Sequence, residues 1–220
     1  MNHHLFFSDL NLRLRGGGDF SVGILPSYAA VIFDEAHALE DIATDYFGFT
    51  VSRNRVDDLA RSALRESVGH GTEVADCLPL LTSCSDRFFS SLTVAAPQLG
   101  MAVRRGGRGG GHVDDGMRSQ REAAADRRRL RAEEISATLV SATESLVSAL
   151  KGLGRAAEQA SPEGLKAIAR RAGDIASDIE FMMRMEDPSY VTWIQLRGES
   201  ASVSASPIDL SNILREELFN

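Results

Sequence analysis

The chain has 220 residues, 43% of them hydrophobic and 25% charged, which is the composition of a soluble globular protein with one ordinary domain or two small ones. No apolar run approaches the roughly 20 residues that cross a bilayer, and the N-terminus lacks the basic segment of a secretory signal. The net charge of −7 argues against a general nucleic-acid binder, and only two cysteines, Cys77 and Cys84, exclude a disulfide scaffold or a four-thiolate metal site. We expect both thiols to be core residues in a reducing cytosol.

Residues 1–50 are predicted to be α/β in character. A short helix over residues 2–14 begins with Asn2 as a cap and ends at the glycines 16–18. Residues 29–33, Ala-Ala-Val-Ile-Phe, form a continuously apolar run, as expected of a strand buried on both faces of a parallel sheet. A helix over residues 36–47 follows directly.

Residues 51–187 are predicted to be helical. Two stretches, 135–153 and 165–182, repeat apolar residues at spacings of three and four, which places those side chains in one stripe on each helix. The link between them is short, with Ser161 and Pro162 placed to start the second helix, so the two helices must fold back as an antiparallel hairpin. The spacing predicts the first helix over residues 118–150, and two earlier helices over 54–68 and 79–92.

Residues 188–220 return to α/β character. Residues 190–196 alternate and are rich in β-formers, Gly198 provides a turn, and residues 201–205 form a second strand. A helix follows over residues 210–219. A helical block between two α/β segments predicts an insertion, in which residues 1–50 and 188–220 pair with each other and residues 51–187 protrude.

The strand predicted over residues 29–33 ends in two carboxylates, Asp34 and Glu35. At the carboxyl edge of an open α/β sheet, an aspartate can hold Mg²⁺ through its water shell. The glutamate that follows it can orient and deprotonate a water that attacks a phosphate. The alternative is a surface turn, in which two acidic residues begin a helix and interact favourably with its dipole.

The string Asp34-Glu35-Ala36-His37 matches the motif II box of superfamily 2 helicases. Residues 24–41 resemble the DinG/XPD branch, the iron–sulfur-type 5′–3′ DNA helicases. Residues 2–10 are similar to the segment that follows the iron–sulfur region in that family, and residues 205–210 with 214–219 resemble the stretch leading into motif III. The resemblance implies an α/β fold: an incomplete RecA-like parallel-sheet motor domain, interrupted by a mainly α-helical arch insertion that contains the long antiparallel helical hairpin.

By position, the resemblance implies that Asp34 binds Mg²⁺ through water, that Glu35 is the base that activates water, and that His37 couples the nucleotide state to the DNA-facing motifs. The intact protein would bind single-stranded or forked DNA and would use ATP and Mg²⁺ to separate DNA strands in repair. We expect a cytoplasmic bacterial protein with no membrane partner, and the oligomeric state stays open.

A basic segment lies on the predicted insertion. Residues 103–131 hold nine arginines against four acidic residues, and six of the arginines are candidates for DNA phosphates: Arg104, Arg105, Arg108, Arg127, Arg128 and Arg129. The alternative, a solvated loop followed by a charged helix face, is equally consistent with the pattern.

Several parts of the family pattern are missing from the chain. It contains no G-x-x-x-x-G-K-[ST] motif to hold the β- and γ-phosphates. The four cysteine ligands of a 4Fe–4S cluster are expected upstream of Asn2, and motif III with the second motor domain is expected after Asn220. We therefore expect part of a longer helicase, inactive without the remainder. Two alternatives stay open: a truncated, non-catalytic relative whose helical arm binds single-stranded DNA or a protein, and a helical protein in which the motif is chance.

Overall fold

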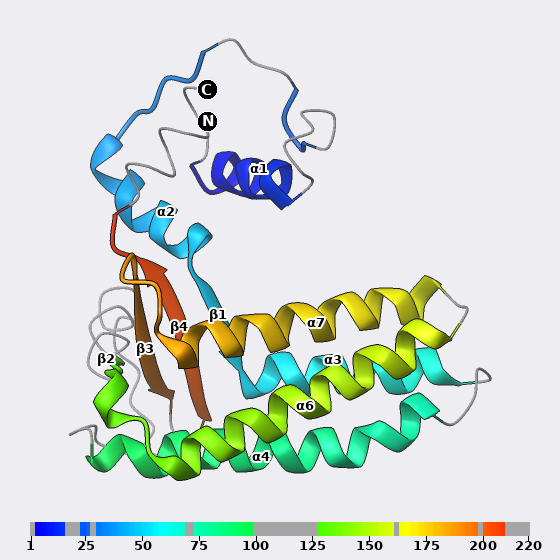
Figure 1. Ribbon diagram of the computed structural model, residues 1–220. Helices are drawn as coiled ribbons and strands as arrows, with labels where there is room; N and C mark the ends of the chain where they lie inside the picture. The colour runs from blue at the N-terminus through cyan, green and yellow to red at the C-terminus, as the bar shows by residue number, and fades with distance from the viewer. Residues whose placement is uncertain are drawn as a thin grey trace, which may run out of the picture. The chain divides into compact units, whose positions relative to one another are not determined.

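The computed structural model describes residues 3–15, 23–26, 30–68, 73–98, 127–160, 163–197 and 200–209 (Figure 1). The chain divides into two compact units. The first contains Met1–Phe49, Asp187–Val191 and Ala205–Asn220, and the second contains Thr50–Glu186 and Thr192–Ser204. Both chain ends therefore belong to one unit, and the helical middle of the chain belongs to the other. The predicted helix over 210–219 and the turn at Gly198 lie outside the described residues.

The first unit is built on two helices, α1 (His3–Arg15) and α2 (Leu39–Phe47), with a 3-10 turn, η1 (Ala36–Ala38), directly before α2. Their buried side chains form one cluster of Phe6, Phe7, Leu10 and Ala43. Ser8 Oγ also donates a hydrogen bond of 3.1 Å to the Tyr46 hydroxyl, which joins α1 to α2. The helices predicted over 2–14 and 36–47 are thus confirmed, except that the second begins as a 3-10 turn.

The strand predicted over residues 29–33 is wrong for the described residues 30–33, which carry no strand pairing. Val31 and Phe33 pack against the cluster of α1 and α2, whereas Ile32 is 92% exposed. A strand buried on both faces needs hydrogen-bonded neighbours on each side. The described residues supply none here, so the segment is extended with only one face covered.

The second unit contains four helices among its described residues: α3 (Arg53–Ser67), α4 (Glu73–Gln98), α6 (Ala137–Gln159) and α7 (Glu163–Arg184). α6 and α7 run side by side and are joined by a short link, which confirms the antiparallel hairpin (Figure 1). The apolar stripes are buried as predicted: Leu139, Leu146 and Leu153 on α6, and Leu165, Ile168, Ile175 and Ile179 on α7. Cys84, on α4, is buried and its thiol is free, as expected of a core residue. The same expectation is wrong for Cys77, which is only half-buried.

The beginning of α6 differs from the prediction. The helix starts at Ala137 instead of residue 118, because Ser136 caps it by accepting a hydrogen bond of 3.2 Å from the Leu139 N–H. Residues 118–126 of the predicted helix lie outside the described residues. Residues 127–129, predicted as helix, form the strand β2 (Arg127–Arg129), and a second 3-10 turn, η2 (Ala132–Glu134), follows it. α4 also begins earlier than predicted and continues through Pro79.

The sheet has four strands in the order β1-β4-β3-β2: β1 (Phe49–Ser52), β4 (Ser200–Pro207), β3 (Tyr190–Arg197) and β2. β3 and β4 confirm the strands predicted over 190–196 and 201–205. β2 pairs with β3 in the antiparallel direction. The predicted parallel, RecA-like sheet is not present in the part of the chain that the structure describes, where the sheet is small and antiparallel. Across these same ranges, no helix combines the length and apolarity that crossing a membrane requires.

Candidate functional site

The segment before Asp34 is fixed by alternate side chains. Phe33 packs edge to face against Phe6 with ring centroids 5.1 Å apart, and it also lies 5.9 Å from the His3 ring. Val31 contacts the same cluster. Because side chains alternate along an extended segment, the residues between and after them face outward. Asp34 is accordingly exposed to solvent.

A sharp turn at Glu35 follows this extended segment. Glu35 has φ 52° and ψ 48°, the left-handed region that L-residues rarely adopt, and it precedes η1 directly. The Asp34 carboxylate accepts a hydrogen bond of 3.0 Å from the Glu35 N–H, which helps to hold the turn. A non-glycine residue in this region costs about 1 kcal/mol relative to a right-handed conformation. The chain therefore maintains an unfavourable backbone conformation at the second carboxylate.

His37 lies against Glu35 across this turn. Its Nδ1 is 3.1 Å from Glu35 Oε2, and the two side chains are 79% and 71% exposed. The three residues predicted as catalytic thus share one turn, and the imidazole contacts the carboxylate directly. The arrangement leaves both carboxylates accessible to a ligand from solvent.

The donor set at this turn fits only one manner of binding a metal. Across the described ranges, no group of three or more His, Cys, Asp or Glu side chains is arranged to hold a metal ion. Mg²⁺ in nucleotide sites commonly keeps several waters and takes only one or two protein carboxylates together with substrate phosphates. Asp34, as a single exposed carboxylate, fits this kind of site, in which waters and substrate phosphates supply the other ligands of Mg²⁺.

Asp9 is a polar residue that the sequence analysis did not single out. It is fully buried in α1, and its Oδ1 accepts hydrogen bonds from the N–H groups of Ile24 (2.5 Å) and Leu25 (2.8 Å). Leu25 packs on the same cluster as Phe33. An aspartate among the apolar residues Phe6, Phe7 and Leu10 was the signal available in the sequence, since a buried carboxylate needs partners.

Replacing Asp9 by Ala is expected to lower the free energy of unfolding by about 1–3 kcal/mol, because two buried N–H groups lose their acceptor. Urea denaturation followed by circular dichroism measures the change. Asp9→Asn keeps one acceptor oxygen and should lose less. Equal stability of the Ala variant and the unaltered protein would contradict the anchoring role of Asp9.

Three of the six arginines predicted to contact DNA are among the described residues, and all three lie in the second unit. Arg128 is half-buried, and its Nη2 forms an ion pair of 2.8 Å with Glu134 Oε1. Arg127 and Arg129 are exposed, and the Arg127 guanidinium lies 4.7 Å from the centre of the Trp193 ring. They lie on a strand and not on the charged helix face considered above. Arg104, Arg105 and Arg108 lie outside the described residues.

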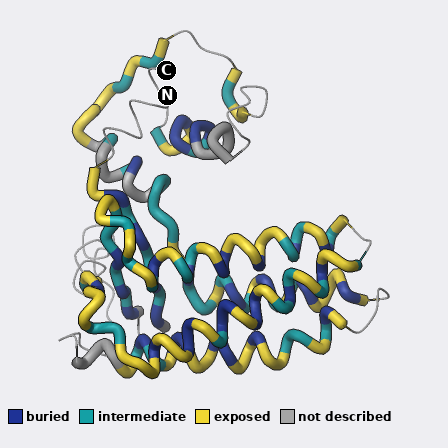
Figure 2. Tube along the Cα trace, in the orientation of Figure 1, coloured by how far each residue is buried: buried dark blue, intermediate teal, exposed yellow. Residues whose placement is uncertain are grey.

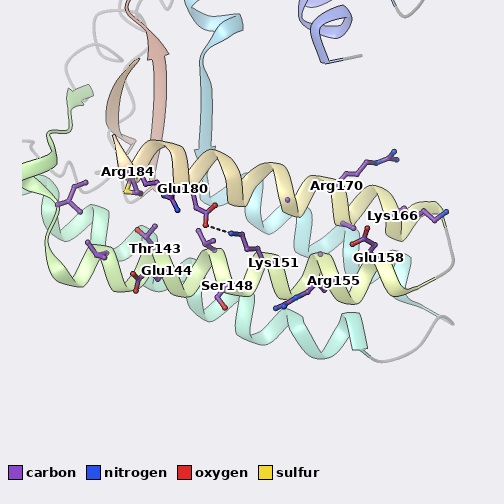
Figure 3. A pocket seen from close by; sticks show the side chains of 17 residues that line it. Thr143, Glu144, Ser148, Lys151, Arg155, Glu158, Lys166, Arg170, Glu180 and Arg184 are labelled. Atoms are coloured by element: carbon purple, nitrogen blue, oxygen red, sulfur yellow. Dashed lines mark hydrogen bonds and ion pairs between the residues drawn. The ribbon is translucent and has the colours of Figure 1, made fainter. Parts of the chain in front are cut away.

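A groove of about 1080 Å³ lies along α6 and α7 (Figure 3). Lys151 Nζ on α6 and Glu180 Oε1 on α7 form an ion pair of 2.7 Å within it. Its lining includes five basic side chains, Lys151, Arg155, Lys166, Arg170 and Arg184, and three acidic ones, Glu144, Glu158 and Glu180. This surface is net positive although the whole chain is net negative.

Two curated proteins resemble part of the chain, and no family model matches it. Over 106 residues, 48% of the chain, it is 37% identical to the ATP-dependent DNA helicase YoaA of Escherichia coli (strain K12). Over 83 residues, 38% of the chain, it is 36% identical to the ATP-dependent DNA helicase YoaA of Haemophilus influenzae. The matched regions make up 15% and 12% of those two proteins, so the chain spans a small part of their length. The chain is therefore partly similar to a DinG-family helicase.

Proposed function

We propose that this chain is part of an ATP-dependent 5′–3′ DNA helicase and carries the residues that activate the attacking water. The observation that carries the proposal is the similarity to two ATP-dependent DNA helicases, in a chain whose Asp34, Glu35 and His37 share one exposed turn. The backbone conformation of Glu35 supports it, since unfavourable conformations are concentrated at functional sites.

In the proposed mechanism, Glu35 accepts the proton of the water that attacks the γ-phosphate of ATP. Asp34 holds Mg²⁺ through water, and the ion, when bound, neutralises charge on the phosphates. His37 contacts Glu35 at 3.1 Å, so a change in the protonation or position of the base reaches His37 directly. This contact supports the proposed coupling of the nucleotide state to DNA.

We assign residues 1–50 and 188–220 to the motor domain and residues 51–187 to an arch-like insertion. The grouping of residues 1–49, 187–191 and 205–220 in one compact unit supports this assignment, although residues 192–204 belong to the unit of the helices. The hairpin of α6 and α7 supports it as well, because it belongs wholly to the other unit. The six basic residues proposed to contact DNA all lie on the insertion in this scheme.

The test is to express the longest reading frame that includes this sequence and to measure ATP hydrolysis and the unwinding of forked DNA. We expect hydrolysis stimulated by single-stranded DNA and unwinding only from substrates with a free 5′ arm. The 220-residue chain alone should hydrolyse no ATP, because it has no lysine-containing phosphate loop. DNA-stimulated hydrolysis by the short chain, or none by the longer protein, would contradict the proposal.

A second candidate function is that of a non-catalytic relative whose helical arm binds a partner protein. The groove on the α6–α7 hairpin favours it. Under this alternative, the longer protein carrying Glu35→Gln still restores growth of a deletion strain under DNA damage. The double variant Arg155→Glu/Arg170→Glu does not restore it, since charge reversal disrupts the groove. Failure of Glu35→Gln to restore growth, together with normal growth of the double variant, favours the helicase.

A further inference from the structure

The register of β2 on β3 separates its three arginines onto two faces of the sheet. Arg127 lies opposite Gln195, Arg128 opposite Ile194, and Arg129 opposite Trp193. Directly opposed residues of antiparallel strands have their side chains on the same face. Arg127 and Arg129 therefore share one face with Trp193 and Gln195, and Arg128 shares the other with Ile194.

These two faces differ in burial. On β3, the residues of the Ile194 face are buried, and Thr192 Oγ1 donates a hydrogen bond of 3.3 Å to the Met182 carbonyl at the end of α7. The helices therefore cover that face. The residues of the other face are half-buried or exposed, and both β3 and β4 alternate in this way (Figure 2). We call this second face the open face; its described members within the second unit are Thr50, Ser52, Arg127, Arg129, Trp193, Gln195, Ser202 and Ser204.

The strands of the sheet contain no acidic residue. Their sequences are Phe-Thr-Val-Ser, Arg-Arg-Arg, Tyr-Val-Thr-Trp-Ile-Gln-Leu-Arg and Ser-Ala-Ser-Val-Ser-Ala-Ser-Pro, with four arginines. The chain as a whole carries 31 acidic residues and a net charge of −7. Of these arginines, Arg127 and Arg129 lie on the open face, whose described members include no acidic residue, so this face is electrostatically complementary to a polyanion.

Trp193 stands between the two exposed arginines. Arg129 is directly opposite it on β2, and the Arg127 guanidinium is 4.7 Å from the centre of its ring. Charged residues on an edge strand also prevent sheets from pairing with one another, and this accounts for the arginines of β2. It does not account for a half-buried tryptophan beside them, or for hydroxyl and amide side chains over the rest of the open face.

We propose that the open face binds single-stranded DNA. One unstacked base displaces the Arg127 guanidinium from the Trp193 ring and stacks there. Arg127 and Arg129 then contact the flanking phosphates, and Gln195 and Ser202 supply hydrogen bonds. A flat face with one aromatic ring requires a base that is free of its duplex, which selects single strands over double-stranded DNA. The inference rests on the proposed function only for the choice of DNA over RNA.

The fluorescence of the intact 220-residue chain tests this directly, because Trp193 is its single tryptophan. Titration with an oligothymidylate should quench the emission to a plateau, and a double-stranded oligonucleotide should not. For two phosphate contacts, the logarithm of the binding constant should fall with the logarithm of salt concentration at a slope of about −1.4. Absence of a saturable change in emission at low salt would overturn the proposal.

Substitutions show which residues bind the DNA. The affinity of each variant is measured from the fluorescence anisotropy of a dye-labelled oligothymidylate. Trp193→Ala should weaken binding about tenfold and Trp193→Phe much less, because a phenyl ring still stacks. Arg129→Ala should weaken binding and bring the salt slope about 0.7 closer to zero. The matched control is Arg65→Ala, which removes the same charge from an exposed position on α3 and should leave binding unchanged.

Equal binding by Trp193→Ala, Arg129→Ala and the unaltered chain would overturn the proposal, as would equal weakening by Arg65→Ala. Tighter binding of oligouridylate than of oligothymidylate would overturn the choice of DNA. The proposed function fails separately: a longer protein without DNA-stimulated ATP hydrolysis would refute the motor even when the open face binds DNA. Hydrolysis that depends on Glu35, with no binding at the open face, would refute this inference alone.

Discussion

Replacing Glu35 by Gln in the longer protein is expected to lower kcat for DNA-stimulated ATP hydrolysis by about 10²–10⁴-fold, which is the contribution of a positioned general base. The amide has nearly the same shape as the carboxylate but cannot accept the proton of the attacking water. Because Asp34 and Mg²⁺ are unaffected, ATP binding should persist. Steady-state hydrolysis and equilibrium binding of a fluorescent ATP analogue, measured on the same preparation, separate the two effects.

Two further variants show whether such a loss arises from chemistry. Glu133→Gln changes an exposed carboxylate on η2 and should leave kcat unchanged. Glu35→Gly removes the base but relieves the left-handed backbone at φ 52°, so it should be inactive without being less stable. Wild-type rates in Glu35→Gln would remove Glu35 from the mechanism, and a much less stable Glu35→Gly would contradict the strained turn.

Leu146→Ala in α6 is expected to lower the free energy of unfolding of the second unit by about 2–5 kcal/mol. Leu146 is fully buried in the stripe of α6, the helix that packs against both α4 and α7. Truncation removes apolar contacts and leaves a cavity between close-packed helices. Urea denaturation followed by the helical circular dichroism signal measures the loss.

The control for this variant is Val140→Ala on the same helix, where the side chain is 43% exposed. Its truncation should cost less than about 1 kcal/mol, since little apolar surface is removed from the interior and Ala favours a helix. A change of similar size in the two variants would mean that α6 does not form the centre of this unit.

The sequence alone determined the elements that depend on neighbouring residues. The apolar repeats of α6 and α7 predicted the hairpin, because side chains three and four residues apart lie on one face of a helix. Alternation over residues 190–196 and 201–205 predicted β3 and β4 in the same local way. The short string from Asp34 to His37 was enough to select the candidate catalytic residues.

Tertiary structure decided what depends on residues far apart in the chain. Residues 30–33 have the composition of a buried strand but carry no strand pairing, because a strand exists only with a hydrogen-bonded neighbour. Residues 127–129 are arginines with good helix propensity, yet they pair with residues 193–195 and form the edge of a sheet. That pairing also placed Trp193 between two arginines, a juxtaposition that spacing along the chain does not encode.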